Sequence, residues 1–243
     1  AVSKEGIALP KLKYILTGGG KLDPTLEGRI RREMGVICFE GYGLTECSPV
    51  VSCNPSEATR KLGTVGPPLQ GYEGQMRDLE GKLLPPGSEG VLWVKGPSVT
   101  SGYFRAPELT AERFHKGWLD TGDIVSIDED GFITILDRAT DLIIVGGFNV
   151  YPQEVETVLN THPAVKMSAA IGIHSSMSGE VVKAFVVPHE GMEVTQHELV
   201  QYAKEHLAHY KVPRKIDIVE ELPLSSVGKV LRRKLKEAEG EDL

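Results

Sequence analysis

Hydrophobic and polar residues alternate along residues 11–16, which is the pattern of a short β-strand with one face toward solvent. A turn of sequence Thr-Gly-Gly-Gly follows at residues 17–20. Asp23 and Pro24 then have the residue types preferred at a helix N-cap and at the first helical position. The pattern therefore predicts a strand, a turn and a helix in succession.

The predicted helix has Leu26 and Ile30 one turn apart, which predicts an apolar stripe along it. Residues 36–39, Val-Ile-Cys-Phe, form an uninterrupted apolar run that predicts a buried strand. This strand continues directly into residues 41–46, Gly-Tyr-Gly-Leu-Thr-Glu. Up to about residue 58 the pattern favours an α/β subdomain.

Residues 59–137 have a different pattern, in which short apolar segments are separated by glycine and proline. Asp130-Gly131 lies between the apolar segments 124–127 and 132–135, and this arrangement is a strong signal for a β-hairpin. The region predicts a small antiparallel sheet or barrel.

From residue 141 onward the pattern is mixed and predicts an α+β domain. Residues 142–145 predict a strand, and Pro152 begins a helix with apolar residues at helical spacing. Thr195 and Glu198 have the spacing of a capping box, which predicts the start of another helix. The remaining predictions are strands near 165–173 and 181–187 and a strongly basic last helix at 229–237.

Composition and charge narrow the class of protein. Of the 243 residues, 40% are hydrophobic and 25% are charged, as in ordinary globular proteins, and the net charge of -7 argues against nucleic acid as a partner. No apolar run approaches the roughly 18 residues that a membrane helix needs, and residues 1–10 lack the pattern of a signal peptide. The three cysteines have no Cys-x-x-Cys spacing, which argues against disulfides or zinc and fits a reducing cytosol. We expect a cytoplasmic protein without a transmembrane segment, with peripheral membrane association and a homodimer left open.

Two segments near the predicted α/β strands have residues suited to a nucleotide. Glycines such as those at 17–20 let a backbone approach a base or a phosphate closely, although such turns are common in proteins that bind neither. In residues 41–46 an aromatic side chain between two glycines is able to stack on a base. Thr45 and Glu46 add hard oxygen atoms of the kind that Mg²⁺ on phosphates prefers.

Two later segments complete the candidate chemistry. Residues 118–123, Trp-Leu-Asp-Thr-Gly-Asp, end in Asp123, and a carboxylate there together with the guanidinium of Arg138 suits ribose hydroxyls. Taken singly, these residues are a turn aspartate and a surface charge. Residues 222–229 form a loop that ends in Lys229, whose compact positive charge suits a negatively charged ligand. The basic residues from Arg232 onward are interpreted as a solvated helix face.

These four motifs, in this order, resemble the adenylate-forming superfamily of acyl-CoA synthetases, peptide-synthetase adenylation domains and firefly luciferase. The resemblance extends from residue 17 to about residue 236 and is strongest to long- or medium-chain fatty acyl-CoA synthetases. It implies that Tyr42 stacks on adenine, that Thr45 contacts phosphate and that Glu46 holds Mg²⁺. The catalytic residues it implies are Lys229, Glu46 and Thr45. The full set implied for ATP and AMP is Gly18, Gly19, Gly20, Gly41, Tyr42, Gly43, Thr45, Asp123, Arg138 and Lys229.

The resemblance also implies a reaction in two halves. A carboxylic acid and ATP form an acyl-adenylate, after which a small C-terminal domain rotates, withdraws Lys229 and lets the thiol of CoA attack. The implied hinge is at residues 138–140, where Thr140 replaces the lysine or aspartate usual in the family. The residues implied for CoA are Gly146, Gly147 and Phe148. Contact of the basic residues from Arg232 onward with CoA phosphates is the lesser alternative to a solvated helix face.

The implied fold class is α/β and α+β. Residues 1–58 would end the nucleotide-binding α/β subdomain of the large N-terminal domain, residues 59–137 would form its small antiparallel β-barrel subdomain, and residues 141–243 would form the mobile α+β C-terminal domain. The family's phosphate loop, rich in Ser, Thr and Gly, is absent from the sequence. We therefore expect the C-terminal part of an enzyme, inactive in adenylation without its N-terminal part.

Three functions stay open at this stage. The first is a parent acyl-CoA synthetase, an ATP-dependent acid–thiol ligase that uses ATP, Mg²⁺ and CoA, with a fatty acid as the favoured substrate. The second is an adenylation domain that loads a carrier protein. The third is a non-catalytic module that binds a nucleotide or CoA.

Overall fold

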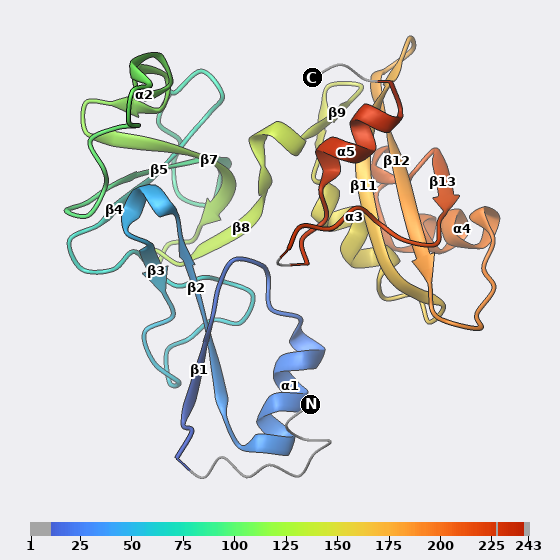
Figure 1. The fold of residues 1–243 in the computed structure, drawn as a ribbon, viewed down its shortest axis with the longest axis horizontal. Helices are drawn as coiled ribbons and strands as arrows, with labels where there is room; N and C mark the ends of the chain where they lie inside the picture. Colours follow the sequence, from blue (N-terminus) through green and yellow to red (C-terminus); the bar gives the residue numbers. More distant parts are fainter. Residues whose placement is uncertain (1–10, 227, 241–243) are drawn as a thin grey trace. The chain divides into compact units, whose positions relative to one another are not determined.

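The computed structural model describes residues 11–226 and 228–240, which divide into two compact units, Ala1–Ile135 and Leu136–Leu243 (Figure 1). The described residues do not include residues 1–10, for which no signal peptide is predicted, or Val227 in the loop 222–229. The unit boundary precedes the predicted hinge, so residues 138–140 belong to the second unit.

The first unit starts with a three-stranded sheet of order β1-β2-β3. β1 (Tyr14–Thr17) and β2 (Ile37–Gly43) pair in parallel, because α1 (Pro24–Met34) carries the chain back to the same end of the sheet. β3 (Val50–Cys53) pairs antiparallel with β2. A 3₁₀ turn, η1 (Thr45–Cys47), connects β2 with β3.

Helix α1 begins where the sequence predicts, but its buried side is different. The Asp23 carboxylate accepts hydrogen bonds from the backbone amides of Thr25 at 2.6 Å and Leu26 at 2.9 Å. The Leu26 side chain of the predicted stripe is exposed, and Glu27 is buried instead. An ion pair of 2.8 Å between Glu27 and Arg60 compensates the buried carboxylate.

The second sheet of this unit is the antiparallel sheet predicted for residues 59–137. Its order is β4-β5-β7-β6, and β8 also pairs with β7. The Asp128 carboxylate organises the predicted hairpin between β7 and β8, because it accepts hydrogen bonds from the amides of Asp130 at 3.0 Å and Phe132 at 2.9 Å. The elements are β4 (Glu73–Arg77), β5 (Glu89–Lys95), α2 (Pro107–Arg113), β6 (Phe114–His115), β7 (Trp118–Ile127) and β8 (Ile133–Arg138), whose last three residues belong to the second unit.

The second unit is built on a five-stranded sheet of order β10-β9-β12-β11, with β13 paired to β12. Its helices lie on both faces of this sheet (Figure 1). The elements are η2 (Ala139–Asp141), β9 (Ile143–Val145), β10 (Phe148–Val150), α3 (Pro152–Leu159), β11 (Val165–Ser175), β12 (Gly179–Pro188), α4 (Gln196–His206), η3 (His209–Lys211), β13 (Lys215–Ile218) and α5 (Arg232–Ala238).

Both faces of the β11–β12 hairpin are buried, because successive strand residues point to opposite sides. Val182, Ala184 and Val186 pack in one core with α3 and α4. Phe185 and Val187 pack in the other with Leu235 of α5. Coverage on both sides explains why residues 181–187 are nearly all apolar.

Two features of this unit differ from the sequence predictions or were missed. The last helix begins at Arg232 rather than at residue 229, because the backbone around Lys229 closes into a turn. Lys183, within the apolar run of β12, is buried and forms ion pairs with Asp217 and Glu239.

The capping box on α4 is confirmed, since Thr195 and Glu198 exchange side-chain and backbone hydrogen bonds.

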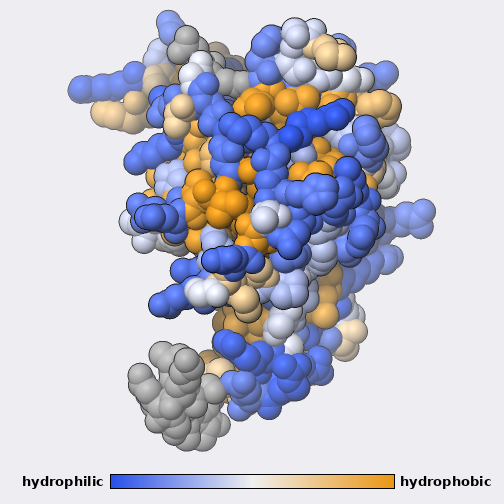
Figure 2. Space-filling model, turned by 90° about the vertical axis from the view of Figure 1, so that its right-hand side faces the viewer, coloured by the Kyte–Doolittle hydropathy of each residue, from blue (hydrophilic) through white to orange (hydrophobic). Residues whose placement is uncertain are grey.

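Polar side chains cover most of the face in Figure 2, with hydrophobic side chains gathered in smaller patches. No helix in residues 11–226 and 228–240 has the length and hydrophobicity to cross a membrane. All three cysteines are free thiols, and burial raises the pKa of each above the ordinary value, that of Cys47 to about 11.

Candidate active site

The two glycine-containing segments of the first unit lie together because β1 and β2 are adjacent and parallel. Thr17 at the end of β1 pairs with Glu40 of β2, so the turn 17–20 and residues 41–43 leave the same end of the sheet. A Cβ atom built on Gly18 would lie 3.2 Å from the carbonyl oxygen of Gly41. Gly18, Gly19 and Gly20 are exposed, so this turn is accessible to a ligand.

Tyr42 and Asp123 are joined directly, although they are far apart in sequence. The Tyr42 hydroxyl donates a hydrogen bond to the carboxylate of Asp123, which is buried at the centre of β7. The Asp123 amide donates to the Thr121 hydroxyl at 3.1 Å. Tyr42, the predicted adenine contact, and Asp123, the predicted ribose contact, are therefore hydrogen-bonded to each other. The sequence alone did not indicate this contact.

The fold of the turn after β2 requires glycine at position 43. A Cβ atom at this position would lie 2.0 Å from the carbonyl oxygen of Pro49. That carbonyl accepts a hydrogen bond of 2.8 Å from the amide of Leu44. The turn that presents Thr45 and Glu46 thus closes against residue 43, where only hydrogen fits.

Glu46 is held by a residue that the sequence analysis missed. The Tyr103 hydroxyl donates a hydrogen bond of 2.8 Å to the Glu46 carboxylate, and burial together with this contact raises the pKa of Tyr103. Thr45 is exposed beside it. The described residues contain no cluster of three or more His, Cys, Asp or Glu side chains suited to a metal. One carboxylate fits Mg²⁺ that is also held by phosphate oxygens and water, which is how this ion is usually bound.

Arg113 of α2 adds a cation near this group. Its Nε atom is buried without a hydrogen-bond partner among the described residues. Its guanidinium lies against Gly122, where an added Cβ would come within 3.1 Å of Nη2. Its charge lowers the pKa of Tyr103, the partner of Glu46, against the stronger effects that raise it. Nothing in the sequence pattern distinguishes this residue except its position shortly before the 118–123 motif.

Lys229 lies in a closed loop of the second unit. The Ser225 amide donates to the Lys229 carbonyl at 2.7 Å, and the Lys229 amide donates to the Ser225 hydroxyl at 3.1 Å. An antiparallel bridge between Leu224 and Val230 closes the base of the loop. The Lys229 side chain is exposed, as a residue that acts on a bound ligand requires.

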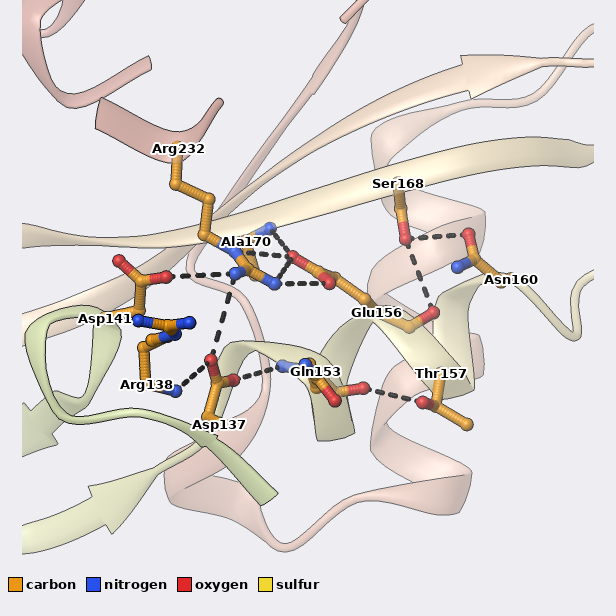
Figure 3. Close-up of polar contacts among 10 residues, drawn as sticks. All are labelled: Asp137, Arg138, Asp141, Gln153, Glu156, Thr157, Asn160, Ser168, Ala170 and Arg232. Carbon is orange, nitrogen blue, oxygen red and sulfur yellow. Dashed lines mark hydrogen bonds and ion pairs between the residues drawn. The ribbon is translucent and has the colours of Figure 1, made fainter. Parts of the chain in front are cut away.

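Arg232, three residues further on, corrects the interpretation of the basic helix as a solvated face. Its side chain is only 14% exposed and contacts three carboxylates (Figure 3). Burial alone would lower the pKa of Arg232, but the charges of Glu156, Asp137 and Asp141 raise it above the ordinary value. Arg233, the next residue, does match the prediction, since it is exposed and pairs with Glu237 within the helix.

The predicted hinge residues lie beside this cluster. Arg138 is exposed, and its amide donates to the buried Asp137 carboxylate at 2.8 Å. The Thr140 carbonyl accepts a hydrogen bond from Lys236 at 3.4 Å. The structure thus gathers Arg138, Thr140 and the start of α5 at one place in the second unit.

The predicted CoA residues form the turn between β9 and β10. Gly146 and Gly147 have φ angles of +58° and +87°, and no atom of residues 11–226 or 228–240 lies within 4 Å of a Cβ built on either. Phe148 stacks on Tyr210 with ring centroids 4.8 Å apart. A cavity of about 180 Å³ is lined there by Val145, Gly146, Phe148, Val181, Val182, His209, Tyr210, Val212 and Arg214.

The predicted site residues therefore form two groups. In the first unit the structure brings together Gly18, Gly19, Gly20, Gly41, Tyr42, Gly43, Thr45, Glu46 and Asp123. In the second unit Thr140 contacts Lys236 of α5, Arg138 is next to Asp137, which faces Arg232, and Lys229 is in the loop that precedes this helix. Gly146, Gly147 and Phe148 form the β9–β10 turn.

Comparisons with protein families cover both units. Residues 2–104 match the family model of the AMP-binding enzymes, and residues 154–229 match the model of the AMP-binding enzyme C-terminal domain. The chain belongs to the AMP-binding enzyme family. The resemblance to adenylate-forming enzymes is confirmed, because the two models match in the predicted order on the two units.

Other members of the AMP-binding enzyme family show what this chain is similar to. It is 44% identical over 225 residues to a long-chain-fatty-acid–CoA ligase of Escherichia coli, covering 92% of this chain and 40% of the ligase. The chain thus spans well under half the length of that relative.

Solved structures of the family confirm the fold class. The o-succinylbenzoate CoA synthetase of Bacillus subtilis, in complex with its acyl-adenylate intermediate, superimposes with a TM-score of 0.87 at 38% identity. That match covers 99% of this chain and 49% of the synthetase. ATP-bound MatB from Rhodopseudomonas palustris also gives a TM-score of 0.87, at 35% identity over 97% of this chain and 49% of MatB.

Proposed function

We propose that this chain is part of an AMP-forming acid–CoA ligase, which converts a carboxylic acid to a thioester through an acyl-adenylate. The contact between Tyr42 and Asp123 carries the proposal, because it unites the 41–46 and 118–123 motifs at the exposed glycine turn. A base stacked near Tyr42 would have its ribose hydroxyls within reach of the Asp123 carboxylate. Two of the relatives named above support the proposal, since one is a CoA ligase and the other a CoA synthetase.

In the first half-reaction the carboxylate attacks the α-phosphorus of ATP and pyrophosphate leaves. Glu46, held by Tyr103, would bind Mg²⁺ on the phosphates, and this ion supplies Lewis-acid stabilisation of negative charge when bound. The exposed ammonium of Lys229 would add a second positive charge at the same transition state. Thr45 would donate a hydrogen bond to a phosphate oxygen.

In the second half-reaction the CoA thiol loses its proton to water, its sulfur forms a bond to the acyl carbon, and the bond from that carbon to the phosphate oxygen breaks, so that AMP leaves. Lys229 would be withdrawn before this step, so we expect it not to act here. Gly146 and Gly147 have open space above them, which would let the pantetheine arm pass close to the backbone. The cavity beside Phe148 and Tyr210, with Arg214 at its lining, would suit the nucleotide end of CoA. Rotation of the second unit between the steps, about residues 138–140, belongs to the same proposal.

The acid is proposed to be a fatty acid. Support comes from the 44% identity to a long-chain-fatty-acid–CoA ligase. The similarity to an o-succinylbenzoate CoA synthetase marks the main alternative, an aromatic acid.

The test is Lys229→Ala in an enzyme that contains this chain. We expect ATP–pyrophosphate exchange to fall by a factor of ~10³, since removing one charge that acts on the transition state has effects of this order. Thioester formation from pre-made acyl-adenylate should stay within about threefold. Lys234→Ala, in the exposed part of α5, is the matched control and should leave both steps unchanged.

Three results would contradict the proposal or part of it. Unchanged exchange in Lys229→Ala would remove Lys229 from adenylation. Loss of both steps to the same extent would contradict the withdrawal of Lys229 by domain rotation. Nucleotide binding without any exchange in the unmodified enzyme would show a non-catalytic module instead of a ligase.

A further inference from the structure

The guanidinium of Arg232 is the centre of a buried charge cluster in the second unit. Its Nη2 atom lies 3.0 and 2.8 Å from the two carboxylate oxygens of Glu156, and its Nε atom lies 3.1 Å from the first of them. Its Nη1 atom lies 3.0 Å from Asp141 and 3.8 Å from Asp137. Figure 3 shows the guanidinium between these side chains. Arginine alone has the planar, forked set of donors that serves several carboxylates at once.

The three carboxylates come from two places in the chain. Asp137 and Asp141 flank residues 138–140, the segment of the proposed hinge. Glu156 is on α3 and also accepts a hydrogen bond of 2.8 Å from the Ala170 amide of β11. Asp137 accepts a further hydrogen bond of 2.9 Å from the Gln153 amide at the start of α3. Arg232 therefore fastens the 137–141 segment to α3 and the sheet.

Arg232 is also connected to Lys229 through backbone hydrogen bonds. Ser225 and Lys229 exchange two hydrogen bonds, and an antiparallel bridge joins Leu224 and Val230. The Leu231 amide donates to the Pro223 carbonyl at 2.8 Å, immediately before Arg232. We therefore expect a displacement of Arg232 to shift the backbone of Lys229. Lys236, one turn along α5, holds the Thr140 carbonyl from the same helix.

We propose that Arg232 is a positioning residue that sets the place of Lys229 relative to the segment 137–141. It contacts no substrate and acts through Lys229, so the inference rests on the proposed function of that lysine. A cluster that merely stabilised the domain would need no particular connection to the lysine loop. Here the Arg232 side chain binds the segment 137–141, and its backbone is continuous with the loop that carries Lys229. The proposed reaction requires these two segments to be correctly placed relative to each other.

The experiment compares Arg232→Gln with Arg233→Gln in an enzyme that contains this chain. Arg233 is the matched control, because it is adjacent, equally charged and exposed, and its ion pair in the described part of the chain is with Glu237 of the same helix. We expect Arg232→Gln to lower ATP–pyrophosphate exchange at least tenfold while thioester formation from pre-made acyl-adenylate stays within about threefold. Arg233→Gln should change neither. An equal fall in both steps, or no fall in exchange, would overturn the inference.

A second arm separates this inference from the proposed function. In a Lys229→Ala background, Arg232→Gln should cause no further loss of exchange, since its effect passes through the lysine. If Lys229→Ala lowers exchange and Arg232→Gln adds its full effect to it, the positioning role is wrong and the proposed function stands. If Lys229→Ala itself has no effect, the proposed function fails.

A third variant addresses folding, because Arg232→Gln leaves three carboxylates without their common partner. The double variant Arg232→Gln/Glu156→Gln removes one of those charges while keeping similar side-chain shapes. It should restore the thermal unfolding temperature toward that of the unmodified enzyme without restoring exchange. Recovery of exchange along with stability would show that the cluster acts only on folding.

Discussion

Glycine stands at different positions of the candidate site for two different physical reasons. At Gly43 an added Cβ would meet the Pro49 carbonyl at 2.0 Å, a distance that no side-chain rearrangement relieves. At Gly20 nothing lies within 4 Å of such a Cβ and φ is not positive. The first glycine is required by the fold of the turn, whereas the second is open toward a ligand.

Gly43→Ala should therefore destabilise the first unit by ~3 kcal/mol or more, because the backbone around Pro49 must move to admit the methyl group. Gly20→Ala should change the unfolding free energy by no more than ~0.5 kcal/mol, as a substitution at an open surface position does. Urea denaturation of the two variants checks this. Equal stabilities for both would contradict the steric explanation of Gly43.

Candidate residues could be selected from the sequence where they belong to a recognisable motif. Residues whose environment is set by partners distant in sequence could not. Tyr42, Glu46, Asp123 and Lys229 stand in recognisable segments. Arg232 and Lys183 were misread or missed, because their partners are distant in sequence: Asp137 and Glu156 for the first, Asp217 and Glu239 for the second. The visible signal for Lys183 was a charge inside an apolar strand, which calls for a buried partner.

At the scale of elements, α3 is tied to β11 by Glu156. Burial is the main cause that raises the pKa of Glu156 above its ordinary value of 4.5, and the charge of Arg232 opposes it. The folded chain therefore holds this proton more tightly than the unfolded chain. This carboxyl favours folding below pH 4.5, and that contribution is lost as the pH rises through the raised folded pKa.

Glu156→Gln should accordingly flatten the decline in unfolding free energy of the second unit as the pH rises from 4.5 upward. Glutamine still accepts the hydrogen bond from the Ala170 amide but does not titrate. Denaturation curves of both forms at several pH values between 4 and 7 provide the measurement, and Glu154→Gln, on the same helix, is the control. A slope unchanged by Glu156→Gln would contradict the assigned pKa shift.

Elements were predictable where local signals decide them. Asp23 and Thr195 cap helices that the sequence placed correctly, and the Asp128 carboxylate closes a hairpin predicted from Asp130-Gly131. The start of α5 was not, because hydrogen bonds between Ser225 and Lys229 compete with the helix there. The order of strands in the second unit also depends on pairings distant in sequence, such as β9 with β12.

At the scale of the whole molecule, each unit has a core of its own. Leu92 is fully buried in the core of the first unit, and Leu199 is fully buried in the core of the second. Chains with separate cores commonly depart from a single all-or-none unfolding transition.

We expect urea unfolding of the chain to show two transitions. Leu92→Ala should shift one of them and Leu199→Ala the other, each by ~2–5 kcal/mol, the usual cost of emptying such a position. Tryptophan fluorescence follows the first unit, because Trp93 and Trp118 both belong to it, and circular dichroism follows both. A single transition that both variants shift equally would show that the units unfold together.

The raised pKa values of the three cysteines have a practical consequence. At neutral pH these thiols are almost fully protonated, and Cys47 in particular is both buried and inert. A cysteine introduced at an exposed position, such as Thr140→Cys, would be by far the most reactive sulfur of the described chain toward maleimide dyes. The native sequence is thus ready for site-selective fluorescent labelling, without prior removal of its own cysteines, and motion around residue 140 becomes observable in single molecules.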